Sequence, residues 1–330
     1  MTHATPAHHT ATGPELAQQA GIGPIAYLRS RGFVHDVSDE DTLNAEFANG
    51  PVTLYIGFDP TATSLHVGNL VGIMLMANLQ RFGHRPIALA GGGTVMIGDP
   101  SGKSIERQLL TVETIEQNLV GIRQQLSGYL DYDGGKFGSN PPAIMRNNAD
   151  WLLKLELIPF LRDIGKHFSV NEMLASETYR VRMETVGLSF IEFNYRVLQA
   201  FDYLHLFRSE GCILQCGGSD QWGNITAGTD LIRRVTGSRA HVLVTPLITT
   251  SSGQKMGKSE GNAVWLDPQQ TSPFQYYQFW RNTTDEDVAR FLRIFTFVSE
   301  PRIQELTATS GVALGEAKDV LAWEATALTH

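Results

Sequence analysis

PVTLYIGFDPTATSLHVGNLVGIMLMANLQRFGHRPIALAGGG (residues 51–93) contains the pattern from which the fold can be predicted. Its first part, 51–58, is rich in β-branched and aromatic side chains and is bounded by Pro and Asp, which predicts a strand. Residues 67–83 are mostly apolar and end at a glycine, as expected for a buried helix. Residues 84–93 are a second apolar run that ends in glycines. A strand, a helix and a strand in this order predict a βαβ unit with a parallel sheet and a right-handed crossover.

The remainder of the chain continues this alternation and then changes to helices alone. Further strands are expected at 143–147, 212–218 and 240–248, with long helices at 189–211 and 219–237. After residue 250 only helical patterns follow, at 272–281, 285–297, 302–308 and 316–329. The predicted fold class is therefore α/β: a doubly wound Rossmann-like parallel sheet followed by a smaller, all-helical C-terminal domain.

The pattern of predicted strands and helices divides the chain into three parts. Residues 1–48 comprise an N-terminal tail and a leading helical segment, with 1–20 polar and aperiodic, as expected for a mobile tail. Residues 49–249 are expected to form the Rossmann-like catalytic domain, which includes a helical connecting insertion at about 105–210. Residues 250–330 carry a lysine-containing loop and the helical domain.

Composition limits the classes of function. The 330 residues are 42% hydrophobic and 18% charged, which is globular composition. No apolar run is long enough to cross a bilayer and no secretory leader opens the chain, so we expect a cytoplasmic protein without a membrane partner. The net charge of −8 argues against a protein that coats DNA, and any contact with RNA would need a local basic patch.

The two cysteines, Cys212 and Cys216, lie in GCILQCGG, which has the pattern of a buried strand. A metal or redox pair would need further partners, and no second pair or histidine completes such a site. Strand alternation predicts both thiols on one face, as reduced core residues.

Two loops combine glycines with lysines: GDPSGKS (98–104) and GQKMGKS (253–259). A P-loop requires four residues between its first glycine and Gly-Lys-Ser, and both loops have three, which excludes a P-loop NTPase. Each loop is either a solvated basic turn or a set of lysines that serves nucleotide chemistry of another design.

The loop after the first strand ends with His66 and Asn69, three residues apart at a helix start. Helix N-termini favour anions, and Gly68 allows a ligand to approach the backbone. No G-x-G-x-x-G motif follows this strand, which counts against a nicotinamide or flavin enzyme. The alternative is a histidine that only caps the helix or lies on the surface.

Two further sets of polar residues stand out. Tyr195, Gln199 and Asp202 form one stripe of an otherwise apolar, aromatic helix. This is either a solvent-facing stripe or a buried stripe that needs a polar ligand. In GGSDQWGN (217–224), an aspartate follows a glycine-ended strand, a place where α/β nucleotide sites bind a ribose hydroxyl, although the segment could simply cap the next helix.

Taken together and in this order, the motifs resemble the class I aminoacyl-tRNA synthetases and, within them, the bacterial tyrosyl-tRNA synthetases. HVGN (66–69) is similar to the HIGH signature and KMGKS (255–259) to the KMSKS signature. Asn69 replaces the second histidine of the first signature, and Gly257 replaces the middle serine of the second. GDPSGKS, FNYRVLQAFDY and GGSDQWGNITAG are similar to blocks of the tyrosine enzymes. The resemblance covers about three quarters of the chain, residues 54–296.

The resemblance implies ATP-dependent activation of L-tyrosine to tyrosyl-adenylate and transfer to the 3'-terminal ribose of tRNA(Tyr). ATP is then a substrate that carries Mg2+ on its phosphates, and no protein residues hold a metal ion. The reaction needs no protein nucleophile, so catalysis consists of positioning and charge stabilisation. The resemblance also implies a homodimer, with the connecting helices around 150–190 as the interface.

The family's functional residues transfer onto matching positions of this chain. Contacts to the phosphates in the transition state would come from Thr61 and His66. Adenine and ribose would be held by Gly57, Asp59, Gly68, Asn69, Gly218 and Asp220. The pyrophosphate would be bound by Lys103, Arg107, Lys255, Lys258 and Ser259.

The tyrosine pocket transfers in the same way. Tyr55 and Asp202 would bind the substrate hydroxyl, and Gln221 would face the carboxylate. The substrate ammonium would be bound by Asp99, Tyr195 and Gln199.

Alternatives remain at this point. A tryptophanyl-tRNA synthetase would share the fold and both signatures, and Tyr55 with Asp202 favours tyrosine. A synthetase body retained as an RNA-binding or interaction module is a second alternative, which the intact signature residues oppose. Bacterial members continue into a small basic tRNA-binding domain, so we expect a chain that ends at residue 330 to form the adenylate but charge tRNA poorly. Four arginines could contact the acceptor stem or simply be solvated: Arg180, Arg182, Arg233 and Arg234.

Overall fold

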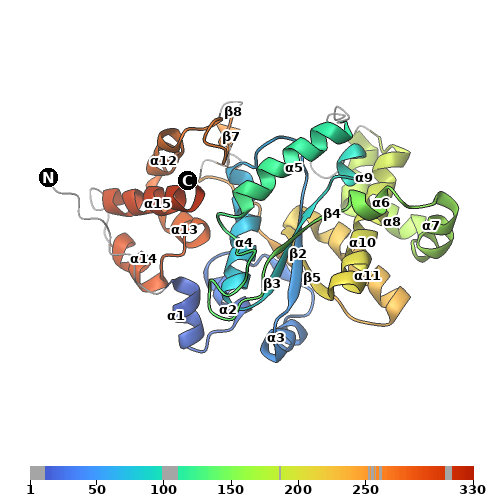
Figure 1. Ribbon diagram of the computed structural model, residues 1–330, viewed down its shortest axis with the longest axis horizontal. Helices are drawn as coiled ribbons and strands as arrows, with labels where there is room; N and C mark the ends of the chain where they lie inside the picture. The colour runs from blue at the N-terminus through green and yellow to red at the C-terminus, as the bar shows by residue number, and fades with distance from the viewer. Residues whose placement is uncertain are drawn as a thin grey trace.

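The fold is that of a computed structural model, which describes residues 12–98, 111–185, 187–251, 253, 256, 258–259, 262–308 and 314–330. At its centre lies a six-stranded sheet in the order β1-β6-β5-β2-β3-β4 (Figure 1). The strands are β1 (Asp36–Val37), β2 (Thr53–Phe58), β3 (Arg85–Ala90), β4 (Ile144–Asn147), β5 (Cys212–Gly218) and β6 (His241–Thr245). Strands β2 to β6 pair in parallel, so the predicted α/β class and the five predicted strands are confirmed.

The chain order reverses between β2 and β5. From β2 the chain proceeds outward through β3 to β4, whereas β5 and β6 lie on the other side of β2. In open α/β sheets this reversal leaves a crevice at the carboxyl ends of the two strands, where ligands bind. The topology therefore places a site next to Phe58 and Gly218, the last residues of β2 and β5.

The leading helical segment expected before β2 is only partly helical. It contains α2 (Pro24–Ser30), then β1, which pairs antiparallel with the edge strand β6, and then α3 (Glu40–Asn49). The sheet is therefore mixed rather than fully parallel. A strand of two residues is too short to produce a periodic pattern, which is why the sequence did not indicate it.

The prediction of a mobile tail at residues 1–20 is also wrong in part, because Gly13–Gln19 forms the helix α1. Glu15 caps the start of this helix, because the Thr12 amide donates to its carboxylate at 2.7 Å. The Gly13 amide donates to the Phe297 carbonyl at 2.9 Å and so attaches α1 to the C-terminal region. Residues 1–11 lie outside the described residues.

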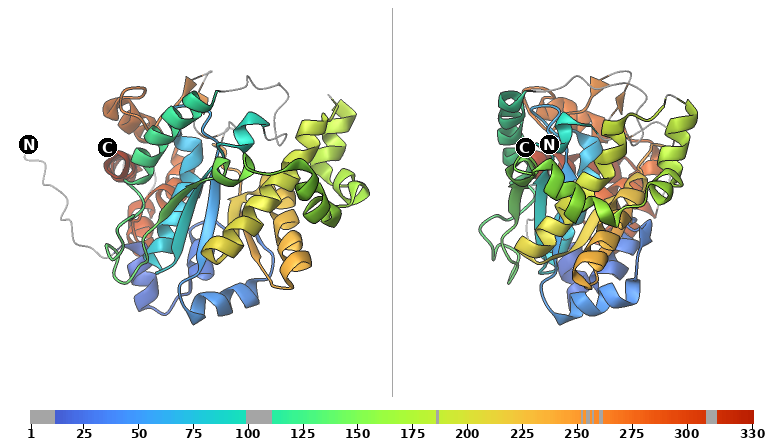
Figure 2. Two further views of the ribbon diagram at one scale, coloured as in Figure 1. Left: turned by 45° about the vertical axis from the view of Figure 1, so that its right-hand side comes forward. Right: turned by 90° about the vertical axis from the view of Figure 1, so that its right-hand side faces the viewer.

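Helices cover both faces of the sheet (Figures 1 and 2). On one face α4 (Leu70–Arg81) and the C-terminal helices pack with Leu54 and Ile56 of β2. On the other face α10 (Phe190–Glu210) and α11 (Trp222–Thr236) pack around Tyr55. The alternating residues of β2 thus enter two separate cores, as a strand buried on both faces requires.

The two cysteines are buried and unbridged, as predicted, but they do not share a face. Cys216 packs with Leu54 and Ile56, whereas Cys212 packs with Tyr55 on the opposite side. The pairing register between β2 and β5 shifts after Cys212, which pairs with Thr53. A bulge of this kind inserts one residue and reverses the alternation, and the sequence carries no sign of it.

The C-terminal region is helical, as predicted, apart from the small hairpin of β7 (Lys258–Ser259) and β8 (Asn262–Ala263). Its helices are α12 (Pro273–Arg281), α13 (Asp285–Phe295), α14 (Glu300–Thr307) and α15 (Leu314–Thr329). Buried residues of these helices belong to the same core as α4.

The range 105–210, expected to be a helical insertion, contains β4 of the central sheet. Helix α5 (Val112–Leu126) precedes β4, and further helices follow it: α6 (Ala149–Leu152), α7 (Leu157–Asp163), α8 (Val170–Leu174) and α9 (Glu177–Thr185). Among the described helices, none has the length and apolar character required to cross a membrane.

Candidate active site

A cleft of about 810 Å3 lies at the carboxyl ends of β2 and β5, where the strand order reverses. Several segments line it: the ends of β2, β3 and β5 with the residues that follow them, Asn148 after β4, α10, the segment after β6, and residues near the lysine loop. Thirteen residues assigned from the sequence are in its lining: Tyr55, Gly57, Asp59, Thr61, His66, Gly68, Asn69, Tyr195, Gln199, Asp202, Gly218, Asp220 and Gln221. The topology thus brings together residues that are far apart in the chain.

The remaining assigned residues lie in the two glycine-lysine loops or, for Arg107, just after the first of them. Asp99, Lys103, Arg107 and Lys255 lie outside the described residues. Lys258 and Ser259 form the strand β7, which pairs with β8, and only their backbone is described.

His66 is the N-cap of the short 3-10 helix Val67–Asn69 that leads into α4. Its Nδ1 accepts from the Gly68 amide at 3.0 Å, and the Asn69 side chain accepts from the His66 amide at 3.0 Å. The capping alternative is therefore correct, and it is compatible with a functional role. An imidazole whose Nδ1 accepts a hydrogen bond carries its proton on Nε2, where it is a donor. Asn69 fills its place in the signature as the second half of this capping box.

The segment around the lysine loop closes over the same turn. The Val67 amide donates to the Val264 carbonyl, and the Leu266 amide donates to the Leu65 carbonyl, both at 2.9 Å. Between them, His66 and Trp265 form an antiparallel β-bridge. A Cβ at Gly68 would lie 3.2 Å from the Met256 carbonyl and 2.7 Å from the His66 ring. Glycine is required here because the backbone of the lysine loop approaches the helix start so closely.

Asp202 is the most strongly perturbed acid in the cleft. It projects from α10 into the apolar layer between that helix and the sheet, and only 2% of it is exposed. Burial raises the pKa of Asp202 to about 7, against two hydrogen bonds that favour the charged form. Tyr55 also lines the cleft, and its hydroxyl has no hydrogen-bond partner among the described residues.

Two residues that donate hydrogen bonds to Asp202 were not among those assigned from the sequence. The Trp151 indole Nε1 donates to Oδ1 of Asp202 at 2.7 Å, and the Asn148 amide donates to Oδ2 at 2.9 Å. Asn148 also donates to Thr94 at 3.0 Å and accepts from the Gly93 amide at 2.7 Å. The available signal was the position of Asn148, directly after a strand of the parallel sheet, where site residues gather.

The polar stripe of α10 faces the cleft rather than solvent. Tyr195 is 7% exposed, and the side-chain oxygen of Gln199 is buried without a partner among the described residues. Gln215 of β5, which was not assigned from the sequence, also lines the cleft. Its side-chain oxygen is likewise buried without a partner among the described residues. Buried polar oxygens without partners are costly, which points to a polar ligand as the missing partner.

The end of β5 is arranged for close approach of a ligand. The Asp220 carboxylate folds back over Gly218, where it lies 2.5 Å from the position that a Cβ would take. Gln221 donates to Asp220 at 3.1 Å and accepts from Asn224 at 3.1 Å. These contacts fix the two side chains at the rim of the cleft.

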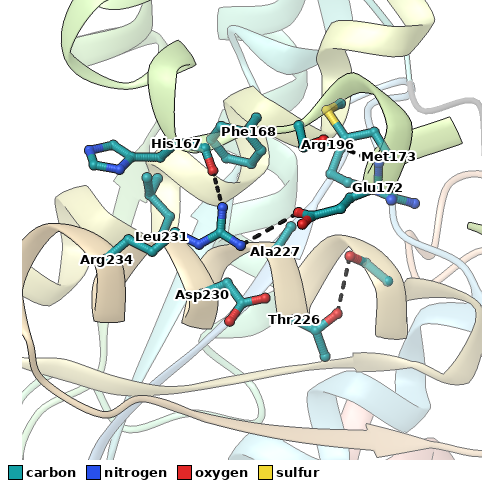
Figure 3. Close-up of a pocket in the computed structure, with 12 residues that line it drawn as sticks. His167, Phe168, Glu172, Met173, Arg196, Thr226, Ala227, Asp230, Leu231 and Arg234 are labelled. Atoms are coloured by element: carbon teal, nitrogen blue, oxygen red, sulfur yellow. Dashed lines mark hydrogen bonds and ion pairs between the residues drawn. The ribbon is translucent and has the colours of Figure 1, made fainter. Parts of the chain in front are cut away.

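A smaller cavity of about 150 Å3 lies apart from this site, between α8 and α11 (Figure 3). Figure 3 shows Arg234 reaching from α11 to the His167 carbonyl and to Glu172. The other arginines considered for RNA contact also form ion pairs: Arg180 with Glu184, Arg182 with Glu192 and Arg233 with Asp230. No group of three or more His, Cys, Asp or Glu side chains in the described part of the chain could hold a metal ion.

Comparison with known proteins identifies the class. The family model for tRNA synthetases class I (W and Y) matches residues 47–330, and the chain belongs to this family. It is 59% identical to the tyrosine--tRNA ligase of Desulfosudis oleivorans over 93% of this chain and 70% of that protein. The tyrosine--tRNA ligase of Caldanaerobacter subterraneus is 49% identical over 93% of this chain and 74% of its own length.

Solved structures agree with this assignment. A C-terminally truncated mitochondrial tyrosyl-tRNA synthetase of Aspergillus nidulans superimposes with a TM-score of 0.84 at 32% identity, covering 96% of this chain and 93% of that chain. The tryptophanyl-tRNA synthetase of Plasmodium falciparum shares the fold, with a TM-score of 0.63 at 14% identity over 92% of this chain and 81% of that chain.

Proposed function

We propose that this chain is a ligase that activates L-tyrosine with ATP and transfers it to tRNA(Tyr). Membership of the class I family supports the use of ATP, and relatives at 49–59% identity support tyrosine as the amino acid. The single observation that carries the choice of substrate is the buried Asp202 carboxylate, which interacts electrostatically with Tyr55, whose hydroxyl has no hydrogen-bond partner among the described residues.

The tyrosine side chain enters the inner end of the cleft. Its hydroxyl donates to Asp202 and completes the hydrogen bonding of Tyr55, while Trp151 and Asn148 keep the carboxylate in place. Phenylalanine would leave the Tyr55 hydroxyl buried without a partner and would deprive Asp202 of one donor, which costs binding energy. Gln199 and Tyr195 on α10, with Asp99, bind the ammonium group.

The nucleotide occupies the outer part of the same cleft. Gly57 leaves open space above the end of β2, and Asp220 lies where a ribose hydroxyl can be bound. His66 donates from Nε2 to a phosphate oxygen as charge develops on it. The substrate is ATP with Mg2+ on its phosphates, and Lys103, Arg107, Lys255 and Lys258 neutralise the leaving pyrophosphate.

Pyrophosphate exchange into ATP tests this proposal. Exchange is measured with tyrosine, phenylalanine and tryptophan in parallel, and we expect it with tyrosine alone. Exchange that depends on tryptophan would assign the chain to the other branch of the family. Exchange that does not require an amino acid would overturn the proposal.

We also infer that the chain acts as a homodimer through the helices after β4. Large apolar side chains are exposed on this part of the surface: Leu153, Leu157, Ile158, Leu161, Val170, Val181, Met183, Phe190 and Ile191. Such a concentration is unusual on the surface of a monomer. The resemblance to a dimeric family and the protein-synthesis activity together support a homodimer in the cytoplasm.

The dimer is tested by sedimentation velocity. Phe190 is 81% exposed, and Phe190→Asp is expected to lower the mass from dimer to monomer. Phe274→Asp is the matched control, because Phe274 is 71% exposed but lies on α12 in the C-terminal region. A wild-type chain that sediments as a monomer at micromolar concentration would contradict the inference.

A further inference from the structure

The hydroxyl group of Ser64 lies at a junction of three chain segments. It accepts from Gln125 Nε2 at 3.0 Å and from the Asp267 amide at 3.1 Å, and it donates to the Leu65 carbonyl at 2.7 Å. Gln125 Oε1 accepts from the Leu65 amide at 2.8 Å. Ser64 and Leu65 are 4% and 3% exposed, so this junction is shielded from water.

The first segment is the loop after β2, which carries Thr61 and leads to His66. The second is α5, which rests on that loop through one face. On this face Asn118 donates to the Pro60 carbonyl at 2.8 Å, and Gln125 lies two turns further along. Between them, a Cβ at Gly121 would lie only 2.2 Å from the Thr63 carbonyl, so the helix backbone itself touches the loop.

The third segment runs from β8 toward α12 and continues directly from the lysine loop. Its backbone is hydrogen-bonded to the loop after β2 through Val264 and Leu266, and Gln270 donates to the hydroxyl of Thr63 in that loop at 3.1 Å. The loop that carries His66 is therefore held between α5 on one side and the continuation of the lysine loop on the other.

We propose that Gln125, acting through Ser64, is a positioning residue for the phosphate chemistry of the proposed function, on which this inference rests. Gln125 does not reach the cleft, whereas Thr61 and His66 line it. A side-chain amide is suited to the junction because it accepts from Leu65 and donates to Ser64 simultaneously. It sets the position of His66 relative to the lysine loop, and α5 follows directly in sequence on residues 99–110, which contain Lys103 and Arg107.

The expected effect is on the rate of the chemical step and not on tyrosine binding. Without Gln125 the buried Leu65 amide has no acceptor, so the loop shifts to find one. Small displacements of groups that stabilise a transition state cost large factors in rate. The tyrosine pocket is built on α10, the segment after β4 and Tyr55 within β2, none of which is hydrogen-bonded to the Gln125 side chain in the described part of the chain, and it should remain unchanged.

Pyrophosphate exchange by Gln125→Met tests the role, because methionine keeps the size and removes both hydrogen bonds. We expect kcat to fall on the order of tenfold to a hundredfold, with KM for tyrosine within about twofold of wild type. Gln125→Glu keeps an acceptor for Leu65 and can accept from the Ser64 hydroxyl, so it should recover part of the rate. Gln124→Met is the control, because Gln124 is exposed on the same helix.

Ser64→Ala is a smaller change that tests the same junction, should Gln125→Met fold poorly. It should lower kcat in the same direction, and the double variant should lose no more than Gln125→Met alone, because the two act as a unit. An unchanged kcat in Gln125→Met, or equal losses in kcat and tyrosine affinity, would overturn the positioning role. A wild-type chain without tyrosine-dependent exchange would instead overturn the proposed function.

Discussion

Trp151 and Asp202 form a buried pair in which the indole Nε1 donates to the carboxylate at 2.7 Å. Trp151 comes from the short helix after β4 and Asp202 from the middle of α10, so the pair joins two elements that are separate in the chain. Asn148 binds the other carboxylate oxygen. The acid is therefore held in one orientation before any ligand arrives.

Trp151→Phe removes this donor and keeps an aromatic ring next to His205, on which the indole stacks with centroids 4.2 Å apart. The charged form of Asp202 loses a hydrogen bond, so its pKa should rise further and tyrosine binding should weaken about tenfold, as for a lost hydrogen bond to a charged group. Exchange kinetics should show a higher KM for tyrosine and an unchanged KM for ATP. Trp323→Phe, at a half-exposed position of α15, should change neither.

Tyrosine use should depend on pH through Asp202, because burial raises the pKa of this carboxyl to about 7. Below pH 7 it is protonated and is a poor acceptor for the substrate hydroxyl, so kcat/KM for tyrosine should rise between pH 5.5 and 8 with a midpoint near 7. Asp202→Asn should abolish most tyrosine activation and leave ATP binding intact. A flat profile in the wild type would exclude Asp202 as the titrating group.

The buried Arg31 attaches α2 to the end of α13. Its guanidinium donates to the carbonyls of Val298, Thr296 and Leu292 at 2.6, 2.6 and 3.1 Å. Arg31→Met would remove the donor from the Val298 and Thr296 carbonyls, whereas the Leu292 carbonyl keeps the Thr296 hydroxyl, and we expect a loss of about 2–4 kcal/mol in the free energy of unfolding.

Urea denaturation of Arg31→Met measures this loss. Arg31→Lys should recover only part of it, because an ammonium group cannot reproduce the planar fork. Arg29 lies on α2, just before Arg31, and forms an exposed ion pair with Glu40 of α3. Arg29→Met removes this pair and should cost less than about 1 kcal/mol. Equal losses from the Arg31 and Arg29 variants would contradict the assigned role.

His84 should make the fold sensitive to acid. It is 3% exposed, its Nδ1 accepts from the Val52 amide at 3.2 Å, and burial lowers its pKa from 6.5 to about 4. Because the folded-state pKa is depressed, the stabilisation is present above pH 6.5 and is lost as the pH falls toward 4. This difference between the unfolded and folded pKa of His84 corresponds to about 3 kcal/mol of folding stability once the loss is complete.

Thermal unfolding as a function of pH tests this contribution. His84→Asn keeps an acceptor near the position of Nδ1 and should reduce the decline in Tm between pH 6.5 and 4. His35→Gln replaces an exposed histidine and should leave the decline as in the wild type. A wild-type decline that His84→Asn does not alter would assign the acid sensitivity to other groups.

Local patterns sufficed for the elements that are long and strongly apolar. The five parallel strands and α4, α10 and α11 were predictable because their local composition, length and bounding residues are typical of strands and of buried helices. The bulge after Cys212 and the two-residue strand β1 were not, because their formation depends on a neighbouring strand. Helix α1 was missed because its polar sequence is ordered by a cap and by contact with Phe297.

The sequence by itself determined the class of fold, the family and the set of candidate residues, since short motifs carry both the turn chemistry and the ligand-binding groups. Only the tertiary structure decided that Asp202 is buried and held by Asn148 and Trp151, that His66 caps its helix through Nδ1, and that Gln125 supports the same loop. The physical reason is that burial and hydrogen-bond partners depend on elements brought together across the sheet, and a pKa or a side-chain orientation follows from those partners.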